Sequence, residues 1–217
     1  DPTFSSVVLG AYKVESKQVL ISNETIQDSS IPLEPIVGRL LGERIARGSN
    51  TMFTTKTDGP TGIATTQCGA VSGKTAAATN AFTLLEVIDL IHSVDIAYRE
   101  QASFMMHDNI IAAARKLVDS QNRPLWEPSI QAGQPDRLYG YALRANNAMA
   151  TNLATGNKIM IFGALGKYQI RVAGGLRTVV ARELYSANDQ TALFGFLRVD
   201  GNLLDAGTDP VKWLNLA

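Results

Sequence analysis

The octapeptide Cys68–Thr75, CGAVSGKT, contains the residue types of a phosphate-binding loop. Such a loop arranges backbone N–H groups and a lysine around phosphates, and needs four residues between its first glycine and the Gly-Lys pair. Here only three residues separate Gly69 from Gly73, and the following KTAAATNAF is too rich in Thr and Asn for the helix that should come next. We therefore interpret the stretch as a turn. A nucleotide-binding enzyme that depends on Lys74 is the distant alternative, and ATP or GTP binding would support it.

The remaining side chains that could do chemistry form no recognisable set. His92 and His107 lie fifteen residues apart, with no cysteine or paired carboxylate at the spacing of metal ligands. The serine of GAVSG stands one place too late for a nucleophile elbow, and Cys68 has no histidine close to it in sequence. The sequence predicts no catalytic residue, no metal site and no cofactor.

Composition narrows the classes of partner. The 217 residues include 20 basic and 20 acidic side chains and have a formal net charge of +0, so no global charge attracts nucleic acid or an anionic membrane. The single cysteine excludes an intramolecular disulfide framework and indicates a reducing compartment. Because no apolar run approaches the roughly 18 residues of a membrane span, we expect no membrane partner.

The order of patterns along the chain predicts an α+β fold. Loose alternation before residue 22 favours one or two strands, and SFMMH (103–107) is typical of a short buried strand. Thr83 and Glu86 form a capping box for one helix, and Asp108 or Asn109 would begin the next. The last third contains four strand-like runs separated by Gly, Asn and Asp: KIMIFGAL, KYQIRVA, RTVVARELY and TALFGFLRVDGNLL.

One long helix follows a polar stretch rich in turn-forming residues. Asp28, Ser29 and Ser30 are all suitable N-caps, and Pro32 suits the first turn because its missing N–H needs no partner there. Apolar residues then recur at three- and four-residue steps, which predicts one buried stripe on a helix reaching about Met52: Ile36, Val37, Leu40, Leu41 and Ile45.

Two glycines, Gly38 and Gly42, interrupt that helix four residues apart. Each costs up to about 1 kcal/mol relative to alanine, so a close approach of another backbone would explain them. Simple tolerance of glycine in a well-packed helix is the alternative. Farther along, residues 119–140 form a long polar loop with several turn signals, and loops of this kind are commonly functional.

In this order the motifs resemble the tailed-bacteriophage major capsid proteins of the Hong Kong 97 fold. The segment KVESKQVLISNETIQDSSIPLEPIVGRLLGERIARGSNTMFTT is similar to the family's arm strand, turn and long spine helix. GPTGI resembles the turn after that helix, and IAYREQASFMMHDNIIAAARKLVDSQNRPLW resembles its helix, Met-containing strand and turn. LYGYALRANNAM, IMIFGALGKYQIR and FLRVDGNLLDAGTDPVKWLNL match later strands, although Asn122, Ala142 and Ala164 depart from the commonest residues.

The resemblance implies an axial domain, a peripheral domain and an extended arm. We expect residues 1–21 to be the descending half of the arm, with its ascending half and any scaffolding segment missing before Asp1. Residues 22–60 would form the peripheral domain with the spine helix, 61–176 the axial domain, and 177–217 the return strands of the peripheral domain.

The implied function is architectural. Copies would assemble into pentamers and hexamers of an icosahedral shell that encloses double-stranded DNA without sequence specificity, inside a virion assembled in the bacterial cytoplasm. A portal, a scaffold or a protease would be assembly partners. The polar loop would form the axial tip, where self-contacts are expected at Arg123, Trp126, Gln131 and Gln134. Asp28, Ser29, Ser30 and Pro32 would form the hinge that sets the angle of the arm.

Some shells of this family cross-link an arm lysine to a peripheral asparagine with the help of a glutamate. Asn188 lies near the asparagine position, but the glutamate position falls around Gly195 and no glutamate follows Glu183. We expect no self-cross-linking. An encapsulin-type nanocompartment with the same fold and a protein cargo is the alternative function, and the contents of the particle would discriminate the two.

Overall fold

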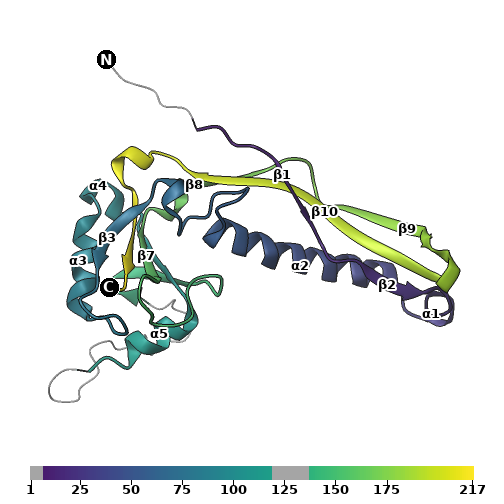
Figure 1. The fold of residues 1–217 in the computed structure, drawn as a ribbon, viewed down its shortest axis with the longest axis horizontal. Helices are drawn as coiled ribbons and strands as arrows, with labels where there is room; N and C mark the ends of the chain where they lie inside the picture. Colours follow the sequence, from purple (N-terminus) through teal and green to yellow (C-terminus); the bar gives the residue numbers. More distant parts are fainter. Residues whose placement is uncertain (1–6, 119–136) are drawn as a thin grey trace.

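A computed structural model describes residues 7–118 and 137–217 of the chain. It shows an elongated half built on a five-stranded sheet and a compact lobe built on a six-stranded sheet (Figure 1). The long helix and the longest strand run side by side through the elongated half, and the short helices α3 (Leu84–Ser93), α4 (Ile96–Arg99) and α5 (Asp108–Arg115) lie in the lobe. The α+β class predicted from the sequence is therefore confirmed.

The fourteen-residue strand β10 (Gln190–Leu203) is the centre of the five-stranded sheet. Strands β1 (Tyr12–Glu15) and β2 (Val19–Ser22) pair with it along one edge. Strands β8 (Tyr168–Val172) and β9 (Arg177–Tyr185) pair with it along the other, and all four pairings are antiparallel. The predicted strand-like runs of the last third thus become β7 to β10 in the expected order.

The helix α2 (Leu33–Thr55) lies along one face of this sheet (Figure 1). It extends three residues beyond the predicted end at Met52. Val37 and Leu41 pack on Leu193, and Ile45 packs on Val14 and Val199, so the buried stripe recurs every four residues. Alternate β10 residues therefore face the helix, and the side chains between them lie on the opposite face of the sheet. The short helix α1 (Asn23–Asp28) stands at the far end.

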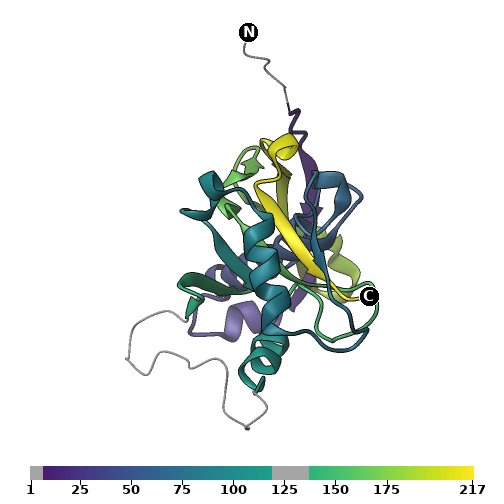
Figure 2. The same ribbon diagram turned by 90° about the vertical axis from the view of Figure 1, so that its left-hand side faces the viewer.

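The compact lobe has the strand order β3-β11-β7-β4-β6-β5, and Figure 2 views this lobe from its outer end. Its strands are β3 (Val71–Thr75), β4 (Ser103–Met106), β5 (Arg137–Leu138), β6 (Tyr141–Ala145), β7 (Lys158–Gly163) and β11 (Val211–Asn215). The β3–β11 and β4–β6 pairs are parallel and the others antiparallel. Five consecutive buried residues of β7, Ile159 to Gly163, run through the middle of the sheet, as expected of a strand covered on both faces.

Helices α3 and α5 pack their apolar sides on this sheet, and α4 leads from α3 into β4, which precedes α5. The predicted capping box of α3 is confirmed, because Thr83 and Glu86 exchange both hydrogen bonds. The predicted cap of α5 is wrong by one residue. His107 is the N-cap, and its Nδ1 accepts from the Asn109 N–H at 3.0 Å, because an imidazole nitrogen can fill the acceptor role of a shorter side chain.

The segment after α2 ties the elongated half to the lobe. The N–H groups of Gly62, Ile63 and Ala64 donate to the carbonyls of Lys56, Phe53 and Thr54 at 2.8 Å each. These are carbonyls that the end of a helix leaves unpaired. The connection therefore closes the helix end and is held rigidly against it.

The expected domain boundaries do not follow the two sheets. Strand β8, inside the range 61–176 assigned to the axial domain, pairs with β10 of the elongated half. Strand β11, inside the range 177–217 assigned to peripheral return strands, pairs with β3 and β7 of the lobe. The chain crosses between the halves more often than consecutive ranges allow, because β10 is long enough to start in one half and lead into the other.

Candidate functional site

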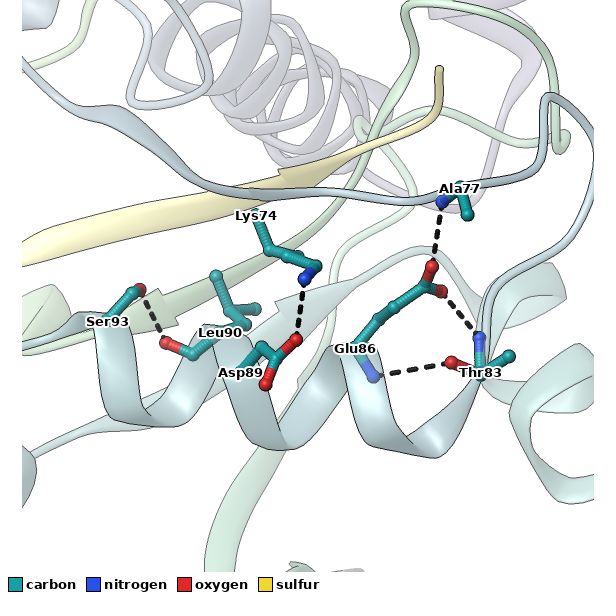
Figure 3. Close-up of polar contacts among 7 residues, drawn as sticks. All are labelled: Lys74, Ala77, Thr83, Glu86, Asp89, Leu90 and Ser93. Atoms are coloured by element: carbon teal, nitrogen blue, oxygen red, sulfur yellow. Dashed lines mark hydrogen bonds and ion pairs between the residues drawn. The ribbon is translucent and has the colours of Figure 1, made fainter.

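The stretch that resembles a phosphate loop serves packing. Cys68 ends a short 3₁₀ helix, Gly69 turns the chain with φ 84°, and Val71–Thr75 is strand β3 rather than only a turn. Lys74 Nζ lies 2.6 Å from Asp89 Oδ2 of α3, and this partner raises the pKa of Lys74 (Figure 3). A Cβ at Gly73 would meet Ser93 Oγ and come within 2.8 Å of Leu90 Cδ1. The glycine and the lysine thus dock β3 on α3.

Glu86 links the start of α3 to the loop after β3. Its Oε1 accepts from the Ala77 N–H at 2.7 Å, and its Oε2 accepts from the Thr83 N–H at 2.8 Å (Figure 3). Burial acts to raise the pKa of Glu86, but these hydrogen bonds, the Thr83 hydroxyl and the charge of Lys74 outweigh it and lower the pKa below 4.5. The carboxylate is therefore held ionised by its backbone partners.

We expect Glu86→Gln to destabilise the chain by about 1–2 kcal/mol at neutral pH, because hydrogen bonds to an ionised acceptor are stronger than those to an amide. Because the pKa of Glu86 is lowered in the folded state, its ionised carboxylate stabilises the folded chain at a pH above 4.5. This contribution is lost as the pH falls through the folded-state pKa. The difference in the free energy of unfolding between wild type and variant, measured by urea unfolding, should therefore become smaller as the pH is lowered. Glu100→Gln, at an exposed position, is the control. A difference independent of pH would contradict the assignment.

The buried Cys68 lies beside a partly buried lysine. Its Sγ is 3.8 Å from the Ile63 carbonyl, and burial raises the pKa of the thiol. Lys158 Nζ donates to the Ala64 carbonyl at 2.6 Å and stands 3.7 Å from the centre of the Trp213 ring. Burial lowers the pKa of Lys158. A thiol with a raised pKa is a poor nucleophile, so the group is a structural contact between the α2 connection and the lobe.

The described residues contain no cluster of three or more metal-ligating side chains. His92 Nδ1 contacts the Arg99 guanidinium at 3.2 Å, and His107 caps α5. In the same parts of the chain, no helix combines the length and apolarity that a membrane crossing needs.

The expected cap of the long helix is wrong. Asp28 is the last residue of α1, and Ser29 is its C-cap, with its Oγ accepting from the Ile31 N–H at 3.2 Å. Pro32 occupies the N-cap of α2, and no side-chain hydrogen bond is made there. Part of the polar stretch forms the separate short helix α1, which ends at Asp28, four residues before the N-cap of α2. A hinge role for Asp28, Ser29, Ser30 and Pro32 stays a proposal.

No backbone among the described residues comes close to the two glycines of α2. A Cβ at Gly38 would meet no described atom within 4 Å, and one at Gly42 would lie 3.6 Å from Leu176 Cδ2, an ordinary contact. Among the described residues no other backbone makes the close approach expected there, and a close contact at these glycines stays a proposal. The expected axial-tip residues Arg123, Trp126, Gln131 and Gln134 lie outside the described residues.

Two of the five residues in the predicted apolar stripe of α2 are exposed. Val37, Leu41 and Ile45 are buried, whereas Ile36 and Leu40 are 38% and 46% exposed. At 100° per residue, Ile36 and Leu40 lie about 100° or more around the helix from Leu41. The five apolar residues therefore cover more than one face, and the second face is left open to solvent in the single chain.

The N-terminal segment is held on the sheet face opposite α2. Asp200 accepts from the Gly10 N–H, and Arg171 Nη1 donates to the Leu9 carbonyl at 2.6 Å and the Gly10 carbonyl at 3.2 Å. Arg171 and Asp200 are direct cross-strand partners in β8 and β10. Two neighbouring strands thus hold the backbone of residues 9 and 10 by both its donor and its acceptors.

The two positions compared with a cross-linking site lie in the β9–β10 turn and within β10. Asn188 is exposed in the turn between β9 and β10. A Cβ at Gly195 would lie 2.9 Å from Ile45 Cδ1 and 3.3 Å from Ser16 Oγ, so a glutamate there would collide with α2. The absence of self-cross-linking stays a prediction.

The fold and the family follow from comparisons with known proteins. The chain is similar to the capsid of an empty GTA particle computed with C5 symmetry, at a TM-score of 0.82 and 24% identity over 97% of this chain and 75% of that one. It is similar to chains of Microbacterium phage Oxtober96 and Gordonia phage Cozz, at TM-scores of 0.72 and 0.67 and identities of 14% and 16%. Both cover 96% of this chain, and 73% and 71% of their own.

A search of curated proteins finds no match. The sequence model of the phage capsid family, however, matches residues 1–214. That range includes the long helix α2 and all strands of both sheets except the last residue of β11. The chain therefore belongs to the phage capsid family, and it is a structural major capsid protein with the Hong Kong 97 fold.

Proposed function

We propose that copies of this chain assemble into pentamers and hexamers that close an icosahedral shell around double-stranded DNA. The shell would be the capsid of a virion, assembled in the cytoplasm of the host with a portal, a scaffold or a protease as partners. The chain would perform no catalysis in this role. Family membership supports the shell, since the matched model spans nearly the whole chain.

The observation that carries the proposal is the open apolar flank of α2. Ile36 and Leu40 lie on a long helix whose other side packs on the five-stranded sheet, and Ile31, two residues before the helix, is also exposed, at 58%. Large apolar side chains grouped on one exposed face are typical of a protein–protein interface. A second copy of the chain is the partner that a shell requires at this face.

We expect Leu40→Asp to abolish or strongly reduce shell formation while the single chain stays folded, because the change puts a charge on an apolar contact but disturbs no core residue. Negative-stain microscopy and sedimentation velocity of the full-length product would measure it. The control is Ala46→Asp, which places the same charge at an exposed position on another side of the same helix. This variant should form normal shells. Normal shells from Leu40→Asp would remove this flank from the assembly surface.

A persistent monomer from the full-length wild-type chain would contradict the proposed function itself. Particles that form but contain a protein cargo in place of DNA would contradict the packaging role alone. Covalent multimers on denaturing gels of boiled particles would contradict the expectation that the shell is not cross-linked.

A further inference from the structure

The face of the five-stranded sheet opposite α2 has a groove that is rich in basic side chains. We call this the basic groove; it has a volume of about 520 Å³ and is lined by Lys13, Arg177 and Arg198 around Phe196, beside the Gly174–Gly175 turn. Lys13 Nζ is 4.6 Å and Arg177 Cζ 5.5 Å from the centre of the Phe196 ring. The strand pairing brings these residues together, since Lys13 lies opposite Arg198 and Arg177 lies opposite Phe196.

The positive charge of the groove is only partly balanced. Lys13 lies 3.4 Å from Glu15, and both side chains are more than half exposed. The nearby Asp200 accepts from the Gly10 and Gly201 N–H groups. Among the described residues, none forms an ion pair with Arg177 or Arg198. The groove therefore presents guanidinium groups to a partner with negative charge.

The far end of the same sheet carries more acidic than basic side chains, although Arg182 of β9 also lies there. Between Gln18 and Gly38 the sequence has no lysine or arginine, and this range includes α1 with the exposed Glu24 and Asp28. The exposed Asp189 of the β9–β10 turn lies beside α1, because Asn23 Nδ2 donates to its Oδ1 at 2.7 Å. Asp28 is in the last turn of α1, where the helix dipole disfavours a negative charge. Local helix stability therefore does not explain Asp28.

One copy cannot join its own groove to its own acidic end. Arg198 and Gln190 are eight residues apart on the extended strand β10, which corresponds to about 26 Å at about 3.3 Å per residue. This separation is more than twice the Debye length of about 10 Å at 0.1 M salt. The net charge of +0 is thus the sum of two separated patches of opposite sign, and these two patches can contact each other only when they belong to different copies.

We propose that the basic groove docks the acidic α1 end of a second copy of this chain. The contact joins two different surfaces, so it is heterologous and repeats head to tail, which closes a ring when the rotation permits. The inference rests on the proposed function, because it names a surface through which copies of the shell protein meet. Phe196 supplies the apolar floor, and Arg177 and Arg198 receive the carboxylates of Glu24 and Asp28 from the neighbouring copy.

Charge reversal on the full-length chain tests the contact. Arg198→Glu and Asp28→Arg should each raise the concentration for half-maximal association roughly three- to tenfold at about 0.1 M salt, with a smaller effect at about 0.5 M. Light scattering and sedimentation equilibrium would measure shells and small oligomers separately. The chain with both changes should return to within about twofold of wild type, because the attraction is restored with its signs exchanged. Arg144→Glu, at an exposed position in β6 of the compact lobe, is the matched control.

The outcomes separate this contact from the proposed function. If wild type forms shells and both single variants behave like Arg144→Glu, the docking inference is wrong and the proposed function stands. Summed losses in the doubly changed chain would also overturn the inference. If wild type forms no shells, the proposed function is wrong. The docking inference is then tested on the small oligomers measured by sedimentation equilibrium, and it is wrong if the single variants form the same oligomers as wild type.

Discussion

Gly163→Ala is expected to destabilise the compact lobe by about 3–5 kcal/mol. Gly163 ends β7 with φ 144°, a conformation that side chains rarely adopt. An added Cβ would collide with the Pro210 carbonyl oxygen and lie 2.8 Å from Val211 Cα. Both obstacles are backbone atoms, one in Pro210 just before the adjoining strand β11 and one in the first residue of that strand, so they cannot move aside as the end of a side chain can. Backbone strain and overpacking therefore both contribute to the loss of stability.

Thermal and urea unfolding of the purified chain would measure the change, and we expect the midpoint of thermal unfolding to fall by about 10 °C. Gly166→Ala is the control, because no described atom lies within 4 Å of its Cβ position and its φ is ordinary. That variant should stay within about 0.5 kcal/mol of wild type. Equal stability of the two variants would show that β11 can shift away from Gly163.

Leu90→Ala should destabilise the chain by about 2–5 kcal/mol, through lost burial and the cavity left behind. Leu90 is fully buried in the core of the compact lobe, on the side of α3 that faces the sheet. Its Cδ1 also lies 2.8 Å from the position of a Cβ at Gly73, which shows how closely β3 approaches α3 there. The cavity would therefore open beneath an edge strand as well as inside the core.

Leu85→Ala on the same helix is the matched control, because Leu85 is 73% exposed. It makes the same substitution with the same helix propensity, so any difference between the two variants measures burial alone. We expect the Leu85 variant within about 0.5 kcal/mol of wild type by urea unfolding. A small effect at Leu90 would mean that β3 and α3 collapse into the space.

Local patterns were sufficient for the elements that depend on neighbouring residues. The capping box at Thr83 and Glu86 needs only two side chains three positions apart, and the sequence therefore identified the start of α3 correctly. The strands β7 to β10 were recognisable because apolar, β-branched and aromatic residues run between Gly, Asn and Asp. The ordered motifs led to the capsid family, which the match to residues 1–214 confirms.

The predicted N-cap of α2 was wrong because several neighbouring polar residues could each serve as a helix cap. Asp28, Ser29 and Ser30 have similar capping propensity, and their use depends on where the preceding chain is held. Here β2 pairs with β10 up to Ser22, so α1 begins directly after the strand. Asp28 and Ser29 then form the end of α1 instead of the start of α2. Such a long-range pairing has no signal in the local sequence.

The sequence by itself determined the α+β class, the long helix, the order of the strands and the family. It also excluded the phosphate loop, through the spacing of two glycines. Only the tertiary structure decided that Ile36 and Leu40 remain exposed, and that Lys13, Arg177 and Arg198 share one groove far from the acidic α1 end. The three basic residues come from strands β1, β9 and β10. The register between strands sets which side chains share a face, and register is a property of strand pairing rather than of any one strand.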